Sequence, residues 1–247
     1  MLSQAGAMDA ALNGSPGARV AIVTDGSRGV GLATTRLLAA RGYAVVVGYL
    51  HDQRAAESTV AAILAGNGDA VAVRADIADD LDVHRLFAET IAAFGGVDVV
   101  VHAAGSAIAA SSVTEAGLDQ FDALVRINTR ATFVVNREAA RHLRNGGAIV
   151  NLSGSAAGSS LRTHGLYAAT SAPAGVLTRA LALELRERNI TVNAVSFEVD
   201  MPCAPNQVAD VIAYLLSEHG HGLTGQVLRV GNPDQGRDLG LSARPRR

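Results

Sequence analysis

The 247-residue sequence predicts an α/β fold in which helices cover both faces of a single doubly wound parallel sheet of about seven strands. Three observations support this class. Short apolar runs alternate with longer stretches of helical spacing, which is the pattern of successive βαβ units. The apolar runs are continuous, as expected for strands that are buried on both sides. A glycine-rich turn follows the first run, where folds of this class bind a nucleotide.

The strands are expected where short runs rich in valine, isoleucine and alanine end at turn residues. The first run, RVAIVT, leads into the glycine-rich TDGSRGVG. Later runs repeat this pattern, with glycine or asparagine at their borders. In chain order the predicted strands cover residues 19–24, 44–49, 70–74, 97–102, 148–152, 190–195 and 226–230.

The helices are expected between these strands, where apolar residues recur at helical spacing. Gly42 stops the first helix and Asn145-Gly146-Gly147 stops the fourth, because glycine readily ends a helix. In chain order the predicted helices cover residues 32–41, 57–65, 81–94, 118–143, 166–188 and 208–216. Pro173 interrupts the fifth helix and removes a hydrogen bond unless it lies in a first turn.

The composition favours one cytoplasmic domain and argues against several function classes. Hydrophobic residues make up 49% of the chain, enough for one large core, and the single Cys203 cannot form an internal disulfide. The net charge of −2 offers no basis for binding nucleic acid or an acidic membrane, and no apolar run is long enough to span a bilayer. We expect a loose leader at 1–17, one domain at 18–235 and a polar tail at 236–247.

The turn after the first strand is a candidate site for the pyrophosphate of a dinucleotide. Glycines let a phosphate approach the backbone, and the N-terminus of the next helix supplies unpaired N–H groups and partial positive charge. This strand–turn–helix setting predicts a Rossmann fold. The residues expected to contribute are Thr24, Asp25, Ser27, Arg28, Gly29, Val30 and Gly31.

Several ordered motifs resemble those of the short-chain dehydrogenase/reductase family over about residues 18–231. The turn matches T-G-x-x-x-G-x-G at Thr24, Gly29 and Gly31, with Asp25 in place of the first glycine. The other matches, in the family's order, are Asp76-Ile77, Ala103-Ala104-Gly105 (against N-A-G), Asn128, IVNLSGS at 149–155, YAAT at 167–170 and ITVNAV at 190–195. The closest likeness is to the branch of 3-oxoacyl and carbonyl reductases.

The resemblance implies a nicotinamide dinucleotide, with Asp76 and Ile77 beside its adenine. The end of the second strand is expected to decide which one, because a carboxylate there binds a ribose 2′-hydroxyl whereas a 2′-phosphate needs basic groups. Tyr49 stands at that position and Arg28 is expected near it, together with His51, so NADP(H) is favoured over NAD(H). Arg28 suits the role of a solvated turn residue equally well.

Asp25 is expected to weaken this site. Aspartate enters the left-handed conformation more readily than most residues, so the turn is expected to survive the substitution. A carboxylate about 4 Å from a pyrophosphate repels it by roughly 4 kcal/mol at an effective dielectric constant of 20. We therefore expect the cofactor to bind weakly or not at all.

The resemblance also implies a proton-transfer site built on Tyr167, with Asn128 positioning a water and a serine orienting the substrate oxygen. Ser155 is the expected serine because SAAG at 155–158 aligns without a gap. Ser153 is the alternative, and either also fits a turn serine that bonds its own backbone. Ser171 stands four residues after the tyrosine, where the family has a lysine that lowers the tyrosine pKa and holds the ribose.

A serine cannot supply the positive charge of that lysine, and the sequence contains no lysine at all. A free tyrosine has a pKa near 10, so proton transfer near neutrality requires a shift of about three units, roughly 4 kcal/mol. Arg162, Arg179 and His164 are the alternative groups, although nothing in the sequence directs the arginines inward and His164 also fits an exposed helix start. Phe197-Glu198 replaces the family's P-G pair, and the segment that normally covers the substrate is short.

Two functions remain open on the sequence. The favoured hypothesis is a degenerate active site with little or no standard hydride transfer, in a protein that acts by binding or assembly, because Asp25, Ser171 and the short lid impair the same chemistry. The alternative is a working NADP(H)-dependent oxidoreductase of an unidentified ketone or alcohol that uses Tyr167 and Ser155. The fold alone does not decide between them.

The two long predicted helices, 118–143 and 166–188, correspond to those through which family members pair. We therefore expect a homodimer or homotetramer, with Val134 and Leu177 as exposed apolar residues in the contact. No partner nucleic acid, membrane or metal ion is expected.

Overall fold

Seven parallel strands form the centre of the molecule. The computed structural model describes residues 17–103, 105, 112–155, 161–198 and 204–231. Its strands are β1 (Val20–Thr24), β2 (Ala44–Tyr49), β3 (Ala70–Arg74), β4 (Val97–His102), β5 (Leu143–Ser155), β6 (Thr191–Glu198) and β7 (Val227–Val230). They form one sheet in the order β3-β2-β1-β4-β5-β6-β7, and every neighbouring pair is parallel. The predicted fold class is confirmed.

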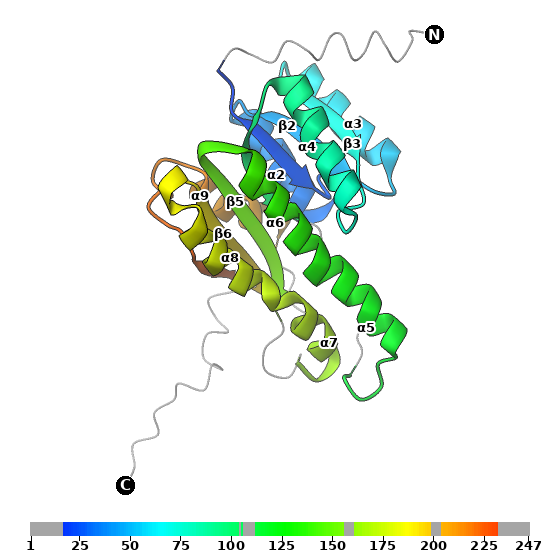
Figure 1. Ribbon diagram of the computed structural model, residues 1–247. Coiled ribbons are helices and arrows are strands. Elements are labelled where there is room, and N and C mark those ends of the chain that lie inside the picture. The colour runs from blue at the N-terminus through cyan, green and yellow to red at the C-terminus, as the bar shows by residue number, and fades with distance from the viewer. Residues whose placement is uncertain (1–16, 104, 106–111, 156–160, 199–203, 232–247) are drawn as a thin grey trace.

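Helices connect the strands and lie on both sides of the sheet (Figure 1). They are α2 (Gly29–Ala40), α3 (Gln53–Ala65), α4 (Asp80–Phe94), α5 (Leu118–Leu124), the π-helix η1 (Val125–Arg130), α6 (Ala131–His142), α7 (Leu161–Ser171), α8 (Pro173–Glu184), the short 3₁₀-helix η3 (Arg186–Arg188) and α9 (Pro205–Leu215). Within the described residues, no helix is both long enough and apolar enough to cross a membrane. The predicted leader (except Gly17), the predicted tail and the domain limit at 235 lie outside the described residues, whereas the limit at 18 lies within them.

Alternate residues along the strands divide the core into two layers. Ile22 of β1 faces the layer formed with α4, α6 and α8, where Phe87 and Val135 are fully buried. Its neighbours Ala21 and Val23 face the other layer, formed with α2 and α9. This two-sided burial explains why the strand sequences are continuously apolar.

The predicted helix 118–143 is one long rod, but it consists of two α-helices joined by a π-helix. In Figure 1, α5, η1 and α6 follow one another as one continuous ribbon that extends beyond the sheet. Its central turn has π geometry over Val125–Arg130, and the rod ends at His142 because Leu143 already pairs with Val97 in the sheet. The sequence missed the π turn because apolar spacing does not distinguish it from an α turn.

The predicted helix 166–188 is divided into α7 and α8 at Pro173. The proline occupies the first position of α8, where its missing N–H has no helical partner to lose, and Ala172 before it keeps helical angles (φ −54°, ψ −36°). The α-helical part ends at Glu184 and is followed by η3. Pro173 therefore separates two helices instead of breaking one.

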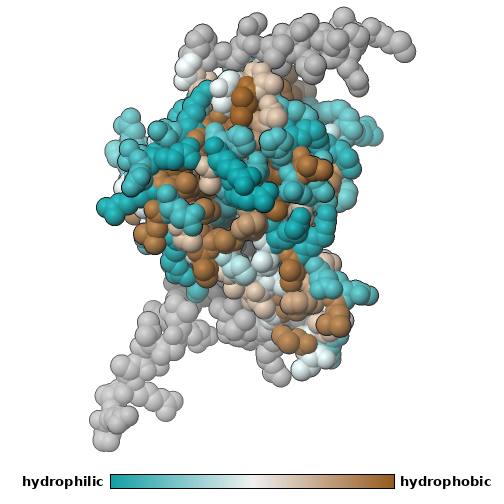
Figure 2. Space-filling view, viewed as in Figure 1, coloured by the Kyte–Doolittle hydropathy of each residue, from teal (hydrophilic) through white to brown (hydrophobic). Residues whose placement is uncertain are grey.

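Exposed apolar side chains lie along these two helical rods. Figure 2 shows brown side chains gathered at the lower end of this face, over α5 and α7. The most exposed large apolar side chains of the two rods are Leu118, Phe121, Phe133, Val176 and Leu183. Val134, expected on the surface, is instead buried in the core, because one residue along a helix turns the side chain by about 100° away from Phe133. Leu177 is half-buried.

Candidate functional site

The turn from Thr24 to Gly31 joins β1 to the first turn of α2, as predicted. Asp25 adopts a left-handed conformation (φ 52°), so aspartate is tolerated in place of glycine as expected. A Cβ atom on Gly31 would lie 2.2 Å from the backbone oxygen of Asp25, so this position requires glycine. The turn thus places the N-terminus of α2 at the carboxyl end of β1, where a phosphate is bound in doubly wound folds.

Gly26 is a residue of this turn that the sequence analysis did not select. A Cβ atom there would lie 2.9 Å from both the Val23 backbone oxygen and the Thr35 hydroxyl oxygen. Its N–H donates to the Gly48 carbonyl of the neighbouring strand at 3.0 Å. Gly26 could have been found from the sequence as a glycine two residues after Thr24. The family motif has its first glycine one residue earlier, at the position of Asp25, so Gly26 was passed over.

Asp25 and Arg28 form an ion pair within the turn. The Arg28 Nε lies 2.6 Å and 2.8 Å from the two carboxylate oxygens of Asp25. This hydrogen bond and the charge of Asp25 raise the pKa of the guanidinium above its usual value. The expected repulsion of roughly 4 kcal/mol was calculated for an isolated carboxylate. That value is too large for this turn, because a cation offsets the charge.

The end of β2 carries basic groups and no carboxylate of its own. Tyr49 is the last residue of β2 and its carbonyl accepts the Ala75 N–H at 2.8 Å. The neighbouring strand brings Arg74 into register with Tyr49, and the Arg74 guanidinium donates to the Leu50 carbonyl at 3.1 Å. The sequence analysis did not select Arg74, because only the strand register places it beside the end of β2.

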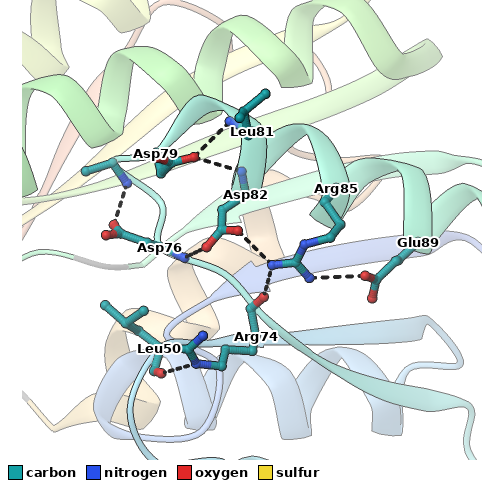
Figure 3. A network of polar contacts seen from close by, with 9 residues as sticks. Leu50, Arg74, Asp76, Asp79, Leu81, Asp82, Arg85 and Glu89 are labelled. Carbon is teal, nitrogen blue, oxygen red and sulfur yellow. Dashed lines mark hydrogen bonds and ion pairs between the residues drawn. The ribbon is translucent and has the colours of Figure 1, made fainter.

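Asp76 lies in a polar network at the end of β3 (Figure 3). Its carboxylate accepts the Ala78 N–H at 3.0 Å and the Arg126 guanidinium at 2.6 Å, and its own N–H donates to Asp82 at 2.9 Å. Burial raises the pKa of Asp76, but the hydrogen bonds from Arg126 and Ala78 outweigh burial and hold this pKa below its ordinary value. The adjacent Ile77 packs against the core. The network fixes the loop that the resemblance places beside the adenine.

His102, at the end of β4, was not recognised as a site residue. Its Nδ1 lies 3.2 Å from the Thr24 hydroxyl and its Nε2 lies 3.2 Å from the Thr132 hydroxyl. The Thr24 hydroxyl oxygen accepts the Ala103 N–H at 3.0 Å, and the Thr132 hydroxyl donates to the Asn128 carbonyl at 2.6 Å. These contacts connect the Thr24–Gly31 turn to η1 through buried side chains.

The same contacts fix the charge and tautomer of His102. Thr132 uses its proton on a carbonyl, so its oxygen accepts from His102 and the ring proton sits on Nε2. Nδ1 then accepts from the Thr24 hydroxyl. Complete burial lowers the pKa of His102 to about 4, in agreement with a neutral ring. His102 is therefore a structural link at neutral pH and carries no charge into the site.

Asn128 lies in the π-helix η1 and is hydrogen-bonded to α7. Its side-chain nitrogen donates to the Thr170 hydroxyl at 3.1 Å, and the Thr129 hydroxyl donates to the Thr170 carbonyl at 2.7 Å. A Cβ atom on Gly105 would lie 3.6 Å from the Asn128 side-chain oxygen, which places the loop after β4 beside this asparagine. Asn128 thus joins two of the predicted site segments.

Tyr167 and Ser171 lie one helical turn apart in α7, and both are buried. The Thr170 hydroxyl between them donates toward the Tyr167 carbonyl at 3.0 Å. Serine therefore occupies the interior position where the family has lysine, with 6% of its surface exposed. Arg179, one alternative source of charge, is exposed on α8. His164, another, is half-buried at a kink of α7.

The remaining predicted residues are placed only in part. Ser155 ends β5, where its backbone pairs with Glu198, but its side chain lies outside the described part of the structure, as does that of Arg162. Ser153 is half-buried in the same strand. Ala104 also lies outside the described residues. So do residues 199–203, which belong to the short segment expected to cover the substrate.

The geometry defines a doubly wound α/β protein with a glycine-rich turn at the carboxyl end of β1 and a buried tyrosine in α7. A family model described as enoyl-(acyl carrier protein) reductase matches residues 26–200. Versicolorin reductase 1 of Aspergillus parasiticus is 37% identical over 229 residues, which are 86% of this chain and 87% of that protein. A hydroxynaphthalene reductase-like protein of Metarhizium majus is 39% identical over 181 residues, 72% of this chain and 67% of its own.

Solved structures agree with these relatives. A dehydrogenase/reductase from Sinorhizobium meliloti has a TM-score of 0.81 at 32% identity and matches 90% of this chain and 97% of its own. A short chain dehydrogenase from Burkholderia cenocepacia in complex with NADP has a TM-score of 0.79 at 32% identity, with coverage of 86% and 96%. The chain belongs to the short-chain dehydrogenase/reductase family, and its named relatives are reductases.

Proposed function

We propose that this protein binds NADP(H) at the Thr24–Gly31 turn and performs hydride transfer only inefficiently, so that its role depends mainly on binding. The observation that carries the proposal is Ser171, buried one turn after Tyr167 in the position where the family has lysine. Because the chain contains no lysine, no other position can supply one.

The preference for NADP(H) is supported by charge at the end of β2. Arg74 is in register with Tyr49 at the end of β2, Arg28 lies in the turn after β1, and Tyr49 brings no carboxylate to this region. Three similar solved structures hold NADP or NADPH. The Asp25–Arg28 pair reduces this preference, since Arg28 must leave a carboxylate to meet a phosphate.

The proposed site retains the groups that hold a substrate and lacks the group that activates the acid. A bound NADPH would supply a hydride to a carbonyl carbon. The Tyr167 hydroxyl would donate the proton to the carbonyl oxygen, while Ser155, or Ser153 in its place, orients that oxygen and Asn128 holds the nearby helices in place. A neutral Ser171 does not stabilise the tyrosinate that this proton transfer leaves.

A working reductase is the second candidate, and one observation favours it. The chain is 37–39% identical to proteins named as reductases of versicolorin and hydroxynaphthalene. A hydroxynaphthalene is accordingly the first substrate to test.

The deciding experiment separates binding from turnover. NADPH and NADH are titrated into the purified protein with nicotinamide fluorescence as the readout, and reduction of a hydroxynaphthalene is then measured. We expect NADPH to bind and the rate to be at least about a hundredfold below that of a family member with the lysine. Ser171→Lys is expected to recover only part of the rate, because the short segment after β6 is unchanged.

Ordinary family rates in the unmodified protein, lost in Tyr167→Phe, would establish the working reductase instead. If neither dinucleotide binds at millimolar concentration, the proposal of a binding role fails as well. Tyr167→Phe is the matched control, because it removes the proton donor and keeps the aromatic ring.

A further inference from the structure

A group of three metal-ligating side chains lies between α4 and α6, outside the residues placed at the cofactor turn and around Tyr167. The group consists of His84 from α4 and of Glu138 and His142 from α6. One ligand atom from each residue lies within 4.8 Å of the other two. No metal site was expected from the sequence, because His84 precedes Glu138 by 54 residues and forms no local motif with it.

The distances within this group match the spacing of metal ligands better than that of hydrogen bonds. The carboxylate oxygen Oε2 of Glu138 lies 3.4 Å from His84 Nδ1 and 3.3 Å from His142 Nε2. Good N–H···O hydrogen bonds span roughly 2.7–3.2 Å. Two ligands about 2.0–2.1 Å from a tetrahedral Zn²⁺ are roughly 3.3 Å apart, and both measured distances are close to that value.

The carboxylate is buried and held in one orientation. Only 3% of the Glu138 side chain is exposed. Its other oxygen, Oε1, accepts a hydrogen bond from the Arg141 guanidinium at 2.8 Å, so Oε2 is the oxygen that faces both imidazoles.

We propose that His84, Glu138 and His142 bind a divalent transition-metal ion, with Zn²⁺ as the preferred ion. Two imidazoles and one carboxylate are a common set of three protein ligands for zinc, with a water in the fourth position. The His84 side chain is 64% exposed, which leaves room for that water and lets the ring adjust. His142 is packed against the Phe87 ring, with centroids 5.7 Å apart, so one imidazole is positioned in advance.

The charge around the site selects among metals. Arg141 and Arg137 lie 2.8 Å and 3.7 Å from Glu138, and their positive charge opposes any cation. Hard ions such as Mg²⁺ and Ca²⁺ depend on several negatively charged oxygens and are not expected to bind here. These arginines repel Zn²⁺ as well, but Zn²⁺, unlike Mg²⁺ and Ca²⁺, binds imidazole nitrogen strongly, and the site offers two imidazoles.

The test measures Zn²⁺ binding to the full chain after removal of any purification tag. Isothermal titration with ZnCl₂ at neutral pH is expected to show one site per chain, and addition of ZnCl₂ is expected to raise the melting temperature because binding to the folded state stabilises it. MgCl₂ is expected to have neither effect. Binding of CoCl₂ adds a visible spectrum that reports nitrogen and oxygen ligands in tetrahedral geometry.

His84→Ala and His142→Ala are expected to weaken Zn²⁺ binding at least about tenfold each. His84→Ala is the safer variant, because an exposed side chain leaves no cavity in the core. The control removes the exposed pair His219 and His221 by substitution with alanine and is expected to keep full affinity. Unchanged Zn²⁺ affinity in folded His84→Ala, or loss of binding only in the control variant, would overturn the proposal.

Discussion

At the scale of single residues, the ion pair between Asp25 and Arg28 changes how the cofactor turn is understood. The carboxylate stands beside the predicted pyrophosphate site, and the guanidinium is the group expected to meet a 2′-phosphate. In the structure each offsets the charge of the other. Such exposed pairs contribute at most about 1 kcal/mol, so a phosphate can compete for Arg28.

Asp25→Gly is predicted to strengthen NADPH binding more than NADH binding. The substitution leaves Arg28 without its carboxylate and places glycine at a positive φ angle that suits it. We expect the affinity for NADPH to rise about tenfold, which corresponds to roughly 1.4 kcal/mol. Fluorescence titration of both dinucleotides measures the ratio.

The matched control for this prediction is the double variant Asp25→Gly with Arg28→Gln. It removes the same carboxylate but supplies no guanidinium at position 28, so the gain in preference for NADPH should disappear. An equal gain for NADH and NADPH in the single variant would show that relief of backbone strain, and not Arg28, is responsible.

His102 is predicted to make the protein less stable as the pH falls below about 6.5. Its pKa is about 4 in the folded protein and 6.5 as the reference value, so in this interval the unfolded chain takes up a proton that the folded protein refuses. The corresponding loss is roughly 3 kcal/mol by pH 4. Urea unfolding at several pH values between 7 and 5 measures the slope.

His102→Asn should flatten this pH dependence even if the variant is less stable at pH 7. The exposed His51, substituted in the same way, serves as the control and should leave the slope unchanged. Parallel slopes in wild-type protein and His102→Asn would mean that other groups cause the pH dependence.

At the scale of elements, Thr170 joins the π-helix η1 to the helix α7. Its hydroxyl accepts from Asn128 and donates toward the Leu166 and Tyr167 carbonyls, and its carbonyl accepts from Thr129. A π turn within an α-helix commonly marks a functional site. Here it brings Asn128 to the helix that carries Tyr167.

Thr170→Val is predicted to reduce the free energy of unfolding by about 1–3 kcal/mol. Valine keeps the shape of threonine but leaves the buried amide of Asn128 without this acceptor. Thermal or urea unfolding measures the change, and Thr114→Val, at an exposed position, is the control and should change stability by less than about 0.5 kcal/mol. A loss no greater than that of the control would show that the contact is not important for stability.

The sequence predicted the strands more accurately than the helices. The runs at 44–49, 70–74 and 97–102 coincide with β2, β3 and β4, because strands buried on both sides have a continuous apolar signal. Helix α3 begins four residues earlier than expected, at Gln53, because the Asp52 side chain caps it by accepting the Ala55 N–H at 2.9 Å. The expected start relied on apolar spacing and overlooked this N-cap, although aspartate is a common one.

The parts of the candidate site that consist of residues close in sequence could be predicted from local motifs. The turn at Thr24–Gly31 and the spacing from Tyr167 to Ser171 depend on neighbouring residues, and the structure places both as expected. Arg74, His102 and Thr170 were missed because their roles come from strand register or from contacts across the sheet. The pairing of Arg28 with Asp25 was missed because each was assigned a separate role.

At the scale of the whole molecule, self-association is predicted through the rods formed by α5–η1–α6 and by α7–α8. Leu183 is 76% exposed and Phe133 49%, and large apolar side chains at such exposure favour burial in an interface. We expect light scattering to give the mass of two or four chains. Phe133→Glu combined with Leu183→Glu should shift the protein toward the monomer.

Leu81→Glu is the control for this prediction, because Leu81 is equally exposed at 76% but lies on α4. It should leave the mass unchanged. A monomer in the wild-type protein at high micromolar concentration would show that the protein does not self-associate. Dissociation by Leu81→Glu as well would show that the interface is not confined to the two rods.

The hydrogen-bond series through His102 also limits how protons can travel in this protein. Read from one end, the donors are the Ala103 N–H, the Thr24 hydroxyl, the His102 ring and the Thr132 hydroxyl, and the final acceptor is the Asn128 carbonyl. Both ends are backbone amides, which neither release nor accept a proton near neutral pH. A proton therefore cannot enter or leave this series through either of these two amides.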